Sequence, residues 1–416
     1  IANVYKKDID NAISDYSKAI ELNPKDVVAY NRRGVAYKIK KEYDRAIENF
    51  NKALEVTPEY VKAIYNRGNI YSIRNEHENA IADYDRALQI YPLDENAYYN
   101  RGIAWYNKGT YNKAIEDYNK TIEINPKNSD AFTSRGLAYF AKGEYEQAIK
   151  NYNKAIELNP TSDGAYNNRG IAYYNKGDKA HALSDYSKAI EINHSNSEAY
   201  LNRGNIYKDK GDIDNVISDY SESIKINPQN AHAYFNRGLI YQGKKEFNLA
   251  ISDYSKAIEI EPTYSEAYFN RGNIYKDDGD IDYAILDYSN VIKINPNNDA
   301  AYYNRGNSFH IKGEIEQALM DYSKAIEINP NIVNAYHNRG AIYNNKGNFN
   351  EAIADYTKAI ELNPRYDIAY HGRGNSYLYK GELDLAIADY SKAIEINPNY
   401  AEVYDNRGTA YNRKGN

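Results

Sequence analysis

The chain has 416 residues, a net charge of −6 and a mean hydropathy of −0.83. This small acidic excess offers no basic surface to nucleic acid or to an anionic membrane, and no apolar run approaches the roughly 18 residues of a membrane span. The absence of cysteine excludes disulfides, thiolate zinc sites and a cysteine nucleophile. The 47 tyrosines exclude a disordered polyelectrolyte.

The N-terminal residues contain no signal for targeting. No charged-then-apolar leader precedes the first structured segment, and the chain begins with Ile1. We therefore expect any targeting peptide to have been removed or to lie outside this chain. The sequence does not fix a compartment, and the cytoplasm is the one we favour.

An Arg-Gly pair recurs every 34 residues along the whole chain. It occurs twelve times, with its glycine first at Gly34 and last at Gly408. The eleven prolines keep the same period, and His194 takes the one place where proline is missing. A fixed period of this length predicts an array of repeats rather than a set of globular domains.

The predicted elements follow this period in chain order. Residues 1–26 contain one helix, the second helix of a half repeat. Residues 27–400 form eleven full repeats of helix, tight turn, helix and tight turn, and residues 401–416 contain the first helix of another half repeat. Alternating helices without a strand pattern predict an all-α solenoid.

Residues 95–128 show why each repeat is expected to form two helices. Apolar residues spaced three and four apart mark one face of each helix. The first helix is expected to end at Lys108-Gly109, because glycine adopts the left-handed cap conformation. The second is expected to end at Asn125-Pro126, because proline disfavours helix at the residue before it.

These recurring residues resemble the tetratricopeptide repeat family. In the repeat quoted above, the residues that match the family pattern are Tyr98, Gly102, Trp105, Ala114, Tyr118, Thr121 and Pro126. The resemblance implies a right-handed superhelical solenoid in which the first helices line a concave inner wall. We expect the glycine and alanine positions to let the two helices of a repeat approach closely, with the aromatic positions in the core.

One departure from the family pattern is systematic. Arginine precedes the glycine in all twelve repeats, where the family usually has leucine. Aspartate lies sixteen residues further on in most repeats, as in Arg203 and Asp219. Because a partly buried guanidinium needs a planar acceptor, we predict ion pairs between the two helices of each repeat. The alternative is a line of cations that binds an acidic ligand.

The candidate binding residues are the outward positions of the first helices. In the repeats between residues 95 and 194 these positions are apolar, which is typical of an interaction surface. They are Tyr99, Ile103, Tyr106, Leu137, Phe140, Ile171 and Tyr174. The alternative is that these side chains cover one another within a tight superhelix.

Asparagine precedes the arginine in nine of the twelve repeats. This series is similar to the asparagine ladder of the O-linked N-acetylglucosamine transferases, whose amides hold a peptide backbone. A primary amide can donate to and accept from one peptide bond, which suits that role. The candidate ladder residues are Asn202, Asn236, Asn270 and Asn304.

No catalytic, metal or cofactor site is expected, and we do not predict an enzyme. The seven histidines fall at six different positions of the repeat, so they lack the short fixed spacing of a metal site. No phosphate loop or nucleophile elbow stands out from the repeat.

The leading hypothesis is a non-catalytic scaffold that binds an extended peptide or a partner helix in the concave groove. The first alternative is an architectural array whose half repeats join head to tail into filaments. Its candidate contact residues are Ala12, Tyr16, Tyr404 and Tyr411. The second alternative is the substrate-recruiting arm of an enzyme whose catalytic domain is absent.

Overall fold

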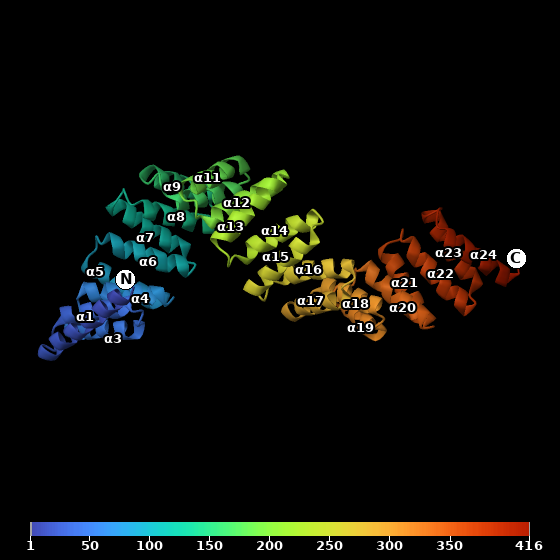
Figure 1. Cartoon of the computed structure of the whole chain (residues 1–416), viewed down its shortest axis with the longest axis horizontal. Coiled ribbons are helices and arrows are strands. Elements are labelled where there is room, and N and C mark those ends of the chain that lie inside the picture. The colour runs from blue at the N-terminus through green and yellow to red at the C-terminus, as the bar shows by residue number, and fades with distance from the viewer. Residues whose placement is uncertain (1, 416) are drawn as a thin grey trace. The chain divides into compact units, whose positions relative to one another are not determined.

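The computed structural model describes residues 2–415, and the side chains of residues 8–415. All regular secondary structure in this range is α-helical, in helices α1 to α24 (Figure 1). The first helices of the repeats are α2 (Val27–Ile39), α4 (Val61–Ile73), α6 (Glu95–Asn107), α8 (Ser129–Ala141), α10 (Asp163–Asn175), α12 (Ser197–Lys210), α14 (Ala231–Gly243), α16 (Ser265–Asp278), α18 (Asp299–Lys312), α20 (Val333–Asn345), α22 (Asp367–Lys380) and α24 (Ala401–Lys414). The second helices are α1 (Ala2–Leu22), α3 (Tyr43–Val56), α5 (His77–Ile90), α7 (Tyr111–Ile124), α9 (Tyr145–Leu158), α11 (Lys179–Ile192), α13 (Ile213–Ile226), α15 (Phe247–Ile260), α17 (Ile281–Ile294), α19 (Ile315–Ile328), α21 (Phe349–Leu362) and α23 (Leu383–Ile396).

The helix ends form where the sequence predicts them. Asp94 caps α6, because its Oδ1 accepts hydrogen bonds from the main-chain N–H groups of Asn96 and Ala97. Gly109 follows α6 with a φ of 81°, a left-handed conformation that favours glycine. Asn125 leaves α7 in an extended conformation, as expected of a residue before proline. These caps recur through the array and keep the hairpins alike.

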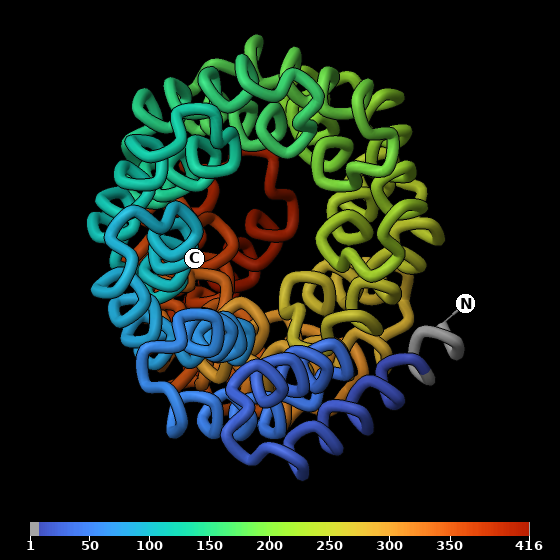
Figure 2. Tube along the Cα trace, turned by 90° about the vertical axis from the view of Figure 1, so that its left-hand side faces the viewer, coloured from blue at the N-terminus to red at the C-terminus, as the bar shows by residue number. Residues whose placement is uncertain are grey.

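The chain forms two compact bodies, an N-terminal body (Ile1–Ile226) and a C-terminal body (Asn227–Asn416). In the N-terminal body, each first helix from α2 to α10 contacts the next first helix, and successive second helices contact each other less. Its repeats are therefore closest along their first helices. The N-terminal body follows an arc in Figure 2. Because the first helices are closest to one another, we call the side of the body that they form the inner wall.

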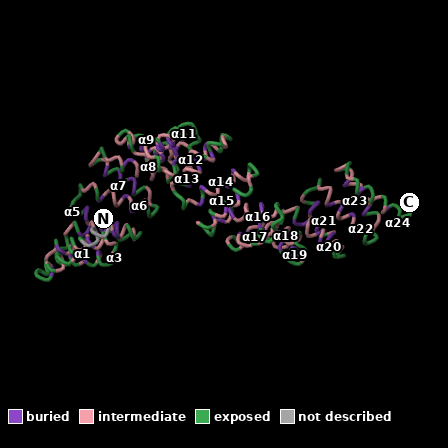
Figure 3. The backbone as a smooth tube through the Cα atoms, in the orientation of Figure 1, coloured by how far each residue is buried: buried purple, intermediate pink, exposed green. Residues whose placement is uncertain are grey.

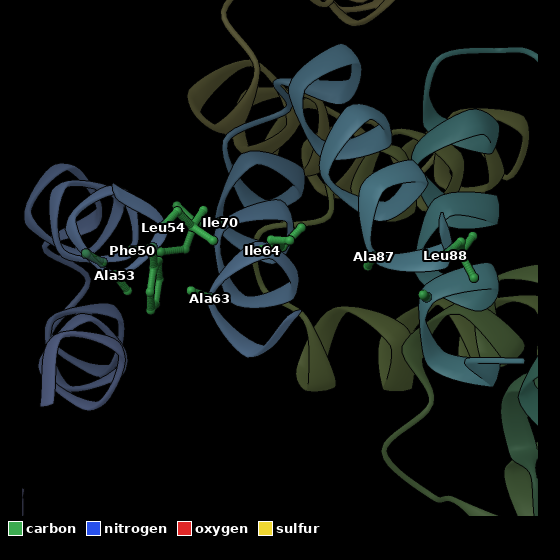
Figure 4. Close-up of a cluster of buried hydrophobic side chains, with 10 residues drawn as sticks. Phe50, Ala53, Leu54, Ala63, Ile64, Ile70, Ala87 and Leu88 are labelled. Carbon is green, nitrogen blue, oxygen red and sulfur yellow. The ribbon is translucent and has the colours of Figure 1, made fainter. Parts of the chain in front are cut away.

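The core of each repeat is an aromatic ring packed against the glycine of the Arg-Gly pair. Tyr220 is fully buried, and a Cβ added to Gly204 would lie 2.7 Å from its Cε1 atom. The space that glycine leaves is thus filled by a ring of the second helix. The first cluster, drawn in Figure 4, has Phe50 in this place, with Leu54, Ile64 and Ile70 buried around it. Buried residues recur in this way along each body (Figure 3).

The predicted ion pairs are present between the helices of the repeats. Arg203 Nε and Nη2 each donate to one oxygen of Asp219 at 2.8 Å. Asp219 is buried, and the guanidinium lies between the rings of Tyr200 and Tyr207, at 5.6 and 5.9 Å from their centroids. Two-pronged pairing and ring stacking both suit arginine better than lysine. The arginine that replaces the family's leucine is therefore a structural residue.

Candidate functional site

The predicted apolar stripe lies on α6, α8 and α10, at the inner wall of the N-terminal body. Its members are half-buried, apart from Tyr174, which is 37% exposed. The residue that follows the glycine packs in each repeat against the buried tyrosine of the second helix. These contacts join Ile103 to the cluster of Tyr118, Leu137 to that of Tyr152, and Ile171 to that of Tyr186. The stripe is thus built in the same way in three successive repeats.

The larger rings of the stripe are partly covered by the following helix. The ring centroids of Tyr106 and Tyr111 are 5.5 Å apart, and those of Phe140 and Tyr145 are 5.4 Å apart. Tyr174 has no such ring beside it in the described residues and is the most open member. The rings of the stripe therefore make intramolecular contacts and still leave apolar area exposed.

The inward side chains of the same wall are uncharged apart from Asp130 near the start of α8, whose charge helps to raise the pKa of Tyr99. On α6, α8 and α10 the other inward positions are Tyr99, Asn100, Ile103, Tyr106, Thr133, Ser134, Leu137, Phe140, Asn167, Asn168, Ile171 and Tyr174. The first helix that follows, α12, carries the charged side chain of Asp209. Its Oδ2 forms an ion pair with Nζ of Lys179 at 2.6 Å. A buried charge needs a paired or hydrogen-bonded partner, so this wall suits an uncharged ligand.

Neighbouring first helices are joined by a recurring side-chain hydrogen bond, which we call a rung. It links the residue two before the glycine of one repeat to the residue three before the glycine of the preceding repeat. Asn66 Nδ2 donates to Asn31 Oδ1 at 3.0 Å, and Asn202 Nδ2 donates to Asn167 Oδ1 at 3.3 Å. Further rungs join Asn100 to Tyr65, Ser134 to Tyr99, Asn338 to Tyr303, and Asn406 to His371.

The rungs divide the four predicted ladder asparagines into two kinds. All four are half-buried, and Asn202 donates to a rung. Within the described part of the chain, no hydrogen-bond partner is present for the side chains of Asn236, Asn270 and Asn304. The repeats before the last two carry Phe235 and Phe269 at the accepting position, and a phenyl ring supplies no oxygen or nitrogen. The 35-residue spacing of rung partners was a signal that the sequence analysis missed.

A further rung is missing in the C-terminal body, at His337. The partner position holds Gly372, where an added Cβ would lie only 2.5 Å from Cζ of Tyr356. The tyrosine ring thus occupies the space that an asparagine would need, and Nδ1 of His337 is buried without a partner. Burial, assisted by nearby His371, lowers the pKa of His337 to about 4.

The glycine of α24, Gly408, has no aromatic ring packed against it, unlike the corresponding glycines of the complete repeats. No heavy atom lies within 4 Å of a Cβ added to Gly408. Tyr404 and Tyr411 on the same helix are 44% and 40% exposed. On α1, Ala12 and Tyr16 are half-buried.

A second apolar surface, which sequence reasoning did not single out, lies on second helices of the C-terminal body. Leu249 and Tyr283 stand one repeat apart, as do Leu286 and Met320. Their exposed fractions lie between 48% and 72%. The only available signal was the repetition of apolar residues at outward positions of the second helices.

The described residues contain no group of three or more histidine, aspartate or glutamate side chains placed to hold a metal ion. Among the described helices, none combines the length and the apolar character needed to cross a membrane.

Comparisons with known proteins agree with this architecture. The family model described as "TPR repeat" matches residues 2–40, 104–143, 136–177, 204–245, 272–310, 306–347 and 374–415. Two models described as "Tetratricopeptide repeat" match residues 27–60, 61–93, 164–196, 231–264 and 333–366, and residues 253–285. A search of curated proteins gave no match.

Solved structures that match this chain include YrrB, described as a TPR protein with an unusual peptide-binding site. YrrB is 24% identical, with 44% of this chain and 95% of YrrB covered and a TM-score of 0.39. MamA is 28% identical over 40% of this chain and 96% of its own, with a TM-score of 0.38. Yeast Tom70 is 18% identical over 93% of this chain and 95% of its own, with a TM-score of 0.37.

The family models match well over half of the chain, in register with the structural repeats. The chain therefore belongs to the tetratricopeptide repeat family, whose helical arrays serve as scaffolds for protein interaction.

Proposed function

We propose that the chain is a non-catalytic scaffold that binds an uncharged peptide segment along the inner wall of the N-terminal body. The observation that carries this proposal is the apolar stripe of α6, α8 and α10, which runs through three repeats without a charged side chain. Exposed apolar area concentrated on one face supports an interaction site, and aromatic side chains contribute most of the binding energy of such sites. Phe140 and Tyr174 are its central and its most exposed rings.

The test begins with selection from a display library of random twelve-residue peptides on the whole 416-residue chain. We expect enrichment of sequences rich in leucine, isoleucine, valine and phenylalanine and poor in charge. A selected peptide, labelled with fluorescein, is then titrated by anisotropy. Replacing Phe140 and Tyr174 together by alanine should raise its Kd at least about tenfold, because truncation of buried aromatic anchors typically has effects of this size.

A matched control replaces Tyr283 and Leu286, two exposed residues of α17, by alanine. This variant should bind the selected peptide as the wild type does, and both variants should keep the wild-type helical circular dichroism. Loss of affinity in the α17 variant alone would place the site on the second helices and overturn the proposal.

Self-association is a second candidate, favoured by the open glycine of α24. Arg407 Nη1 donates to Ser391 at 3.0 Å, yet within the described residues it has no carboxylate partner like that of Arg203. The α1 helix of a second copy offers Asp15, which is exposed, and next to it Tyr16. These are the residue types that occupy the corresponding places in complete repeats.

Light scattering against concentration tests this second candidate. A head-to-tail contact does not close on itself, so mass should grow with concentration. Replacing Tyr404 and Tyr411 by aspartate should abolish the growth, because the contact would then bury unpaired charges. A wild-type chain that stays monomeric throughout would exclude this mode of assembly.

A further inference from the structure

Most second helices carry a buried tyrosine whose ring packs against the glycine of the first helix. In five repeats the residue that follows the glycine is asparagine, and its Oδ1 accepts a hydrogen bond from the hydroxyl of that tyrosine at 2.7 Å. These pairs are Tyr84 with Asn69, Tyr220 with Asn205, Tyr288 with Asn273, Tyr322 with Asn307, and Tyr390 with Asn375. In these repeats the phenol is satisfied within the protein.

The three repeats of the apolar stripe differ at this position. The residue that follows the glycine is Ile103, Leu137 or Ile171, and none of these can accept a hydrogen bond. Ser134 is a hydrogen-bond partner for the first of the three phenols, Tyr118. The hydroxyls of Tyr152 and Tyr186 have no partner among the described residues.

These two hydroxyls nevertheless reach solvent-accessible space. Among the described residues, the fully buried side-chain polar atoms without a partner are His77 Nδ1, Ser223 Oγ and His337 Nδ1, so the two hydroxyls are not fully buried. The rings themselves are almost completely enclosed, with Tyr152 at 1% and Tyr186 at 2% exposure. Each hydroxyl is therefore among the few atoms of its side chain that remain accessible.

The hydroxyl group of each of these two tyrosines lies near residues of the stripe. Tyr106 is close enough to Tyr152 to help raise the pKa of that phenol, and Tyr174 does the same for Tyr186, although burial is the larger cause in both. Leu137 and Ile171 pack against the two tyrosine clusters from the first helices. Because burial favours the neutral phenol, both groups remain hydrogen-bond donors at neutral pH.

We infer that the hydroxyls of Tyr152 and Tyr186 donate hydrogen bonds to main-chain carbonyl oxygens of an extended, uncharged peptide on the inner wall. The inference rests on the proposed function and adds the polar contacts that an apolar stripe alone lacks. A bound peptide excludes water from the two hydroxyls, and a buried donor without an acceptor is unfavourable. The site therefore selects a ligand with an acceptor at both places. A carboxylate would fit poorly, because Lys179, the cation beside Tyr174, is already paired with Asp209.

The spacing of the two donors indicates the form of the bound segment. They lie one repeat apart, and neighbouring packed helices are separated by about 10 Å. A polyproline II helix advances about 3.1 Å per residue and presents the same face at every third residue. Carbonyls of residues i and i+3 in such a segment would therefore face the two phenols in succession.

Single-oxygen variants test the inference with the fluorescein-labelled peptide selected above. Tyr152→Phe and Tyr186→Phe keep the ring against its glycine and remove only the hydroxyl. Each should raise the Kd about five- to tenfold, the effect of losing one hydrogen bond, and leave the unfolding midpoint unchanged. The matched control is Tyr220→Phe, whose hydroxyl is already bonded to Asn205. The control should lower the unfolding midpoint and leave the Kd unchanged.

A second variant gives the hydroxyl group of Tyr186 an acceptor within the protein and leaves the phenol in place. Ile171→Asn places beside Tyr186 the residue that accepts the tyrosine hydroxyl in five other repeats. The hydroxyl is then bonded within the protein, so adding Tyr186→Phe to Ile171→Asn should cause no further loss of affinity. An equal further loss would contradict the predicted contact.

The outcomes separate this inference from the proposed function. If the Phe140 and Tyr174 double variant loses affinity while both single-oxygen variants bind as the wild type does, the phenols are not donors and the proposed wall stands. If neither kind of variant changes the Kd, the peptide binds elsewhere and both proposals are wrong.

Discussion

Arg203 of α12 holds Asp219 of α13 through two parallel hydrogen bonds of 2.8 Å, one from Nε and one from Nη2. The carboxylate is buried, so removing it leaves a largely buried guanidinium without its acceptor. We expect Asp219→Ala to lower the free energy of unfolding by about 2–4 kcal/mol, since breaking a buried pair costs far more than breaking an exposed one. Urea unfolding followed by circular dichroism measures the change.

The repeats themselves supply a milder variant of the same contact. Asn151 accepts from Arg135 Nε at 2.7 Å in the position that aspartate holds elsewhere. Asp219→Asn should therefore lose clearly less stability than Asp219→Ala. If the alanine variant unfolds at the wild-type urea concentration, the arginines are not structural, and an acidic ligand becomes the better explanation for them.

Two glycines of the same repeat position should respond in opposite ways to alanine. At Gly204 the new methyl would lie 2.7 Å from Tyr220 Cε1, and overpacking of this kind typically costs about 1–3 kcal/mol. At Gly408 the space is open, so alanine should stabilise α24 by up to about 1 kcal/mol through its helix propensity. Thermal unfolding of the two variants measures both effects. A Gly204→Ala protein as stable as the wild type would contradict the tight packing of ring on glycine.

His337 should make the protein sensitive to mild acid. Its pKa in the folded chain is about 4, against an ordinary value near 6.5, so between these pH values the unfolded chain binds a proton that the folded chain does not. Stability is therefore lost as the pH falls through this window, by up to about 3 kcal/mol from this residue. Other groups also titrate there, so the informative quantity is the difference between the wild type and a variant.

The suitable variant is His337→Phe, because phenylalanine occupies the same repeat position at Phe235 and Phe269. Urea unfolding at pH 7 and at pH 4.5 should show a smaller loss on acidification in the variant than in the wild type. Equal losses in the two proteins would mean that His337 protonates freely in the folded state.

The asparagines without rungs should differ in function from those with rungs. If the free amides of Asn270 and Asn304 hold a peptide main chain, replacing both by alanine should weaken binding of a selected peptide that contacts the C-terminal body, with little change in stability. Asn338 donates to Asn307 at 2.9 Å, so Asn338→Ala should instead reduce stability. Competition between peptides in anisotropy titrations, with parallel thermal unfolding, distinguishes the two effects. Unchanged binding in the double variant would exclude a role for these amides.

The sequence alone determined the architecture, because every local signal recurs with one period. Proline, the capping glycine and the apolar positions end and orient each helix through its own neighbours in the chain, as in α6 and α7. The pairing of Arg203 with Asp219 was also predictable, since a guanidinium in a core needs an acceptor and aspartate recurs sixteen residues after the arginine in most repeats.

Tertiary structure decided which polar groups at the inner wall are satisfied and which are free. The rung between Asn202 and Asn167, and the bond between Tyr220 and Asn205, form only when side chains from different helices come within hydrogen-bonding distance. A repeat pattern shows that asparagines and tyrosines recur, yet it cannot show that Tyr186 is left without an acceptor. That depends on Ile171, which lies on another helix, and a buried phenol is satisfied or free according to the atoms around it in space.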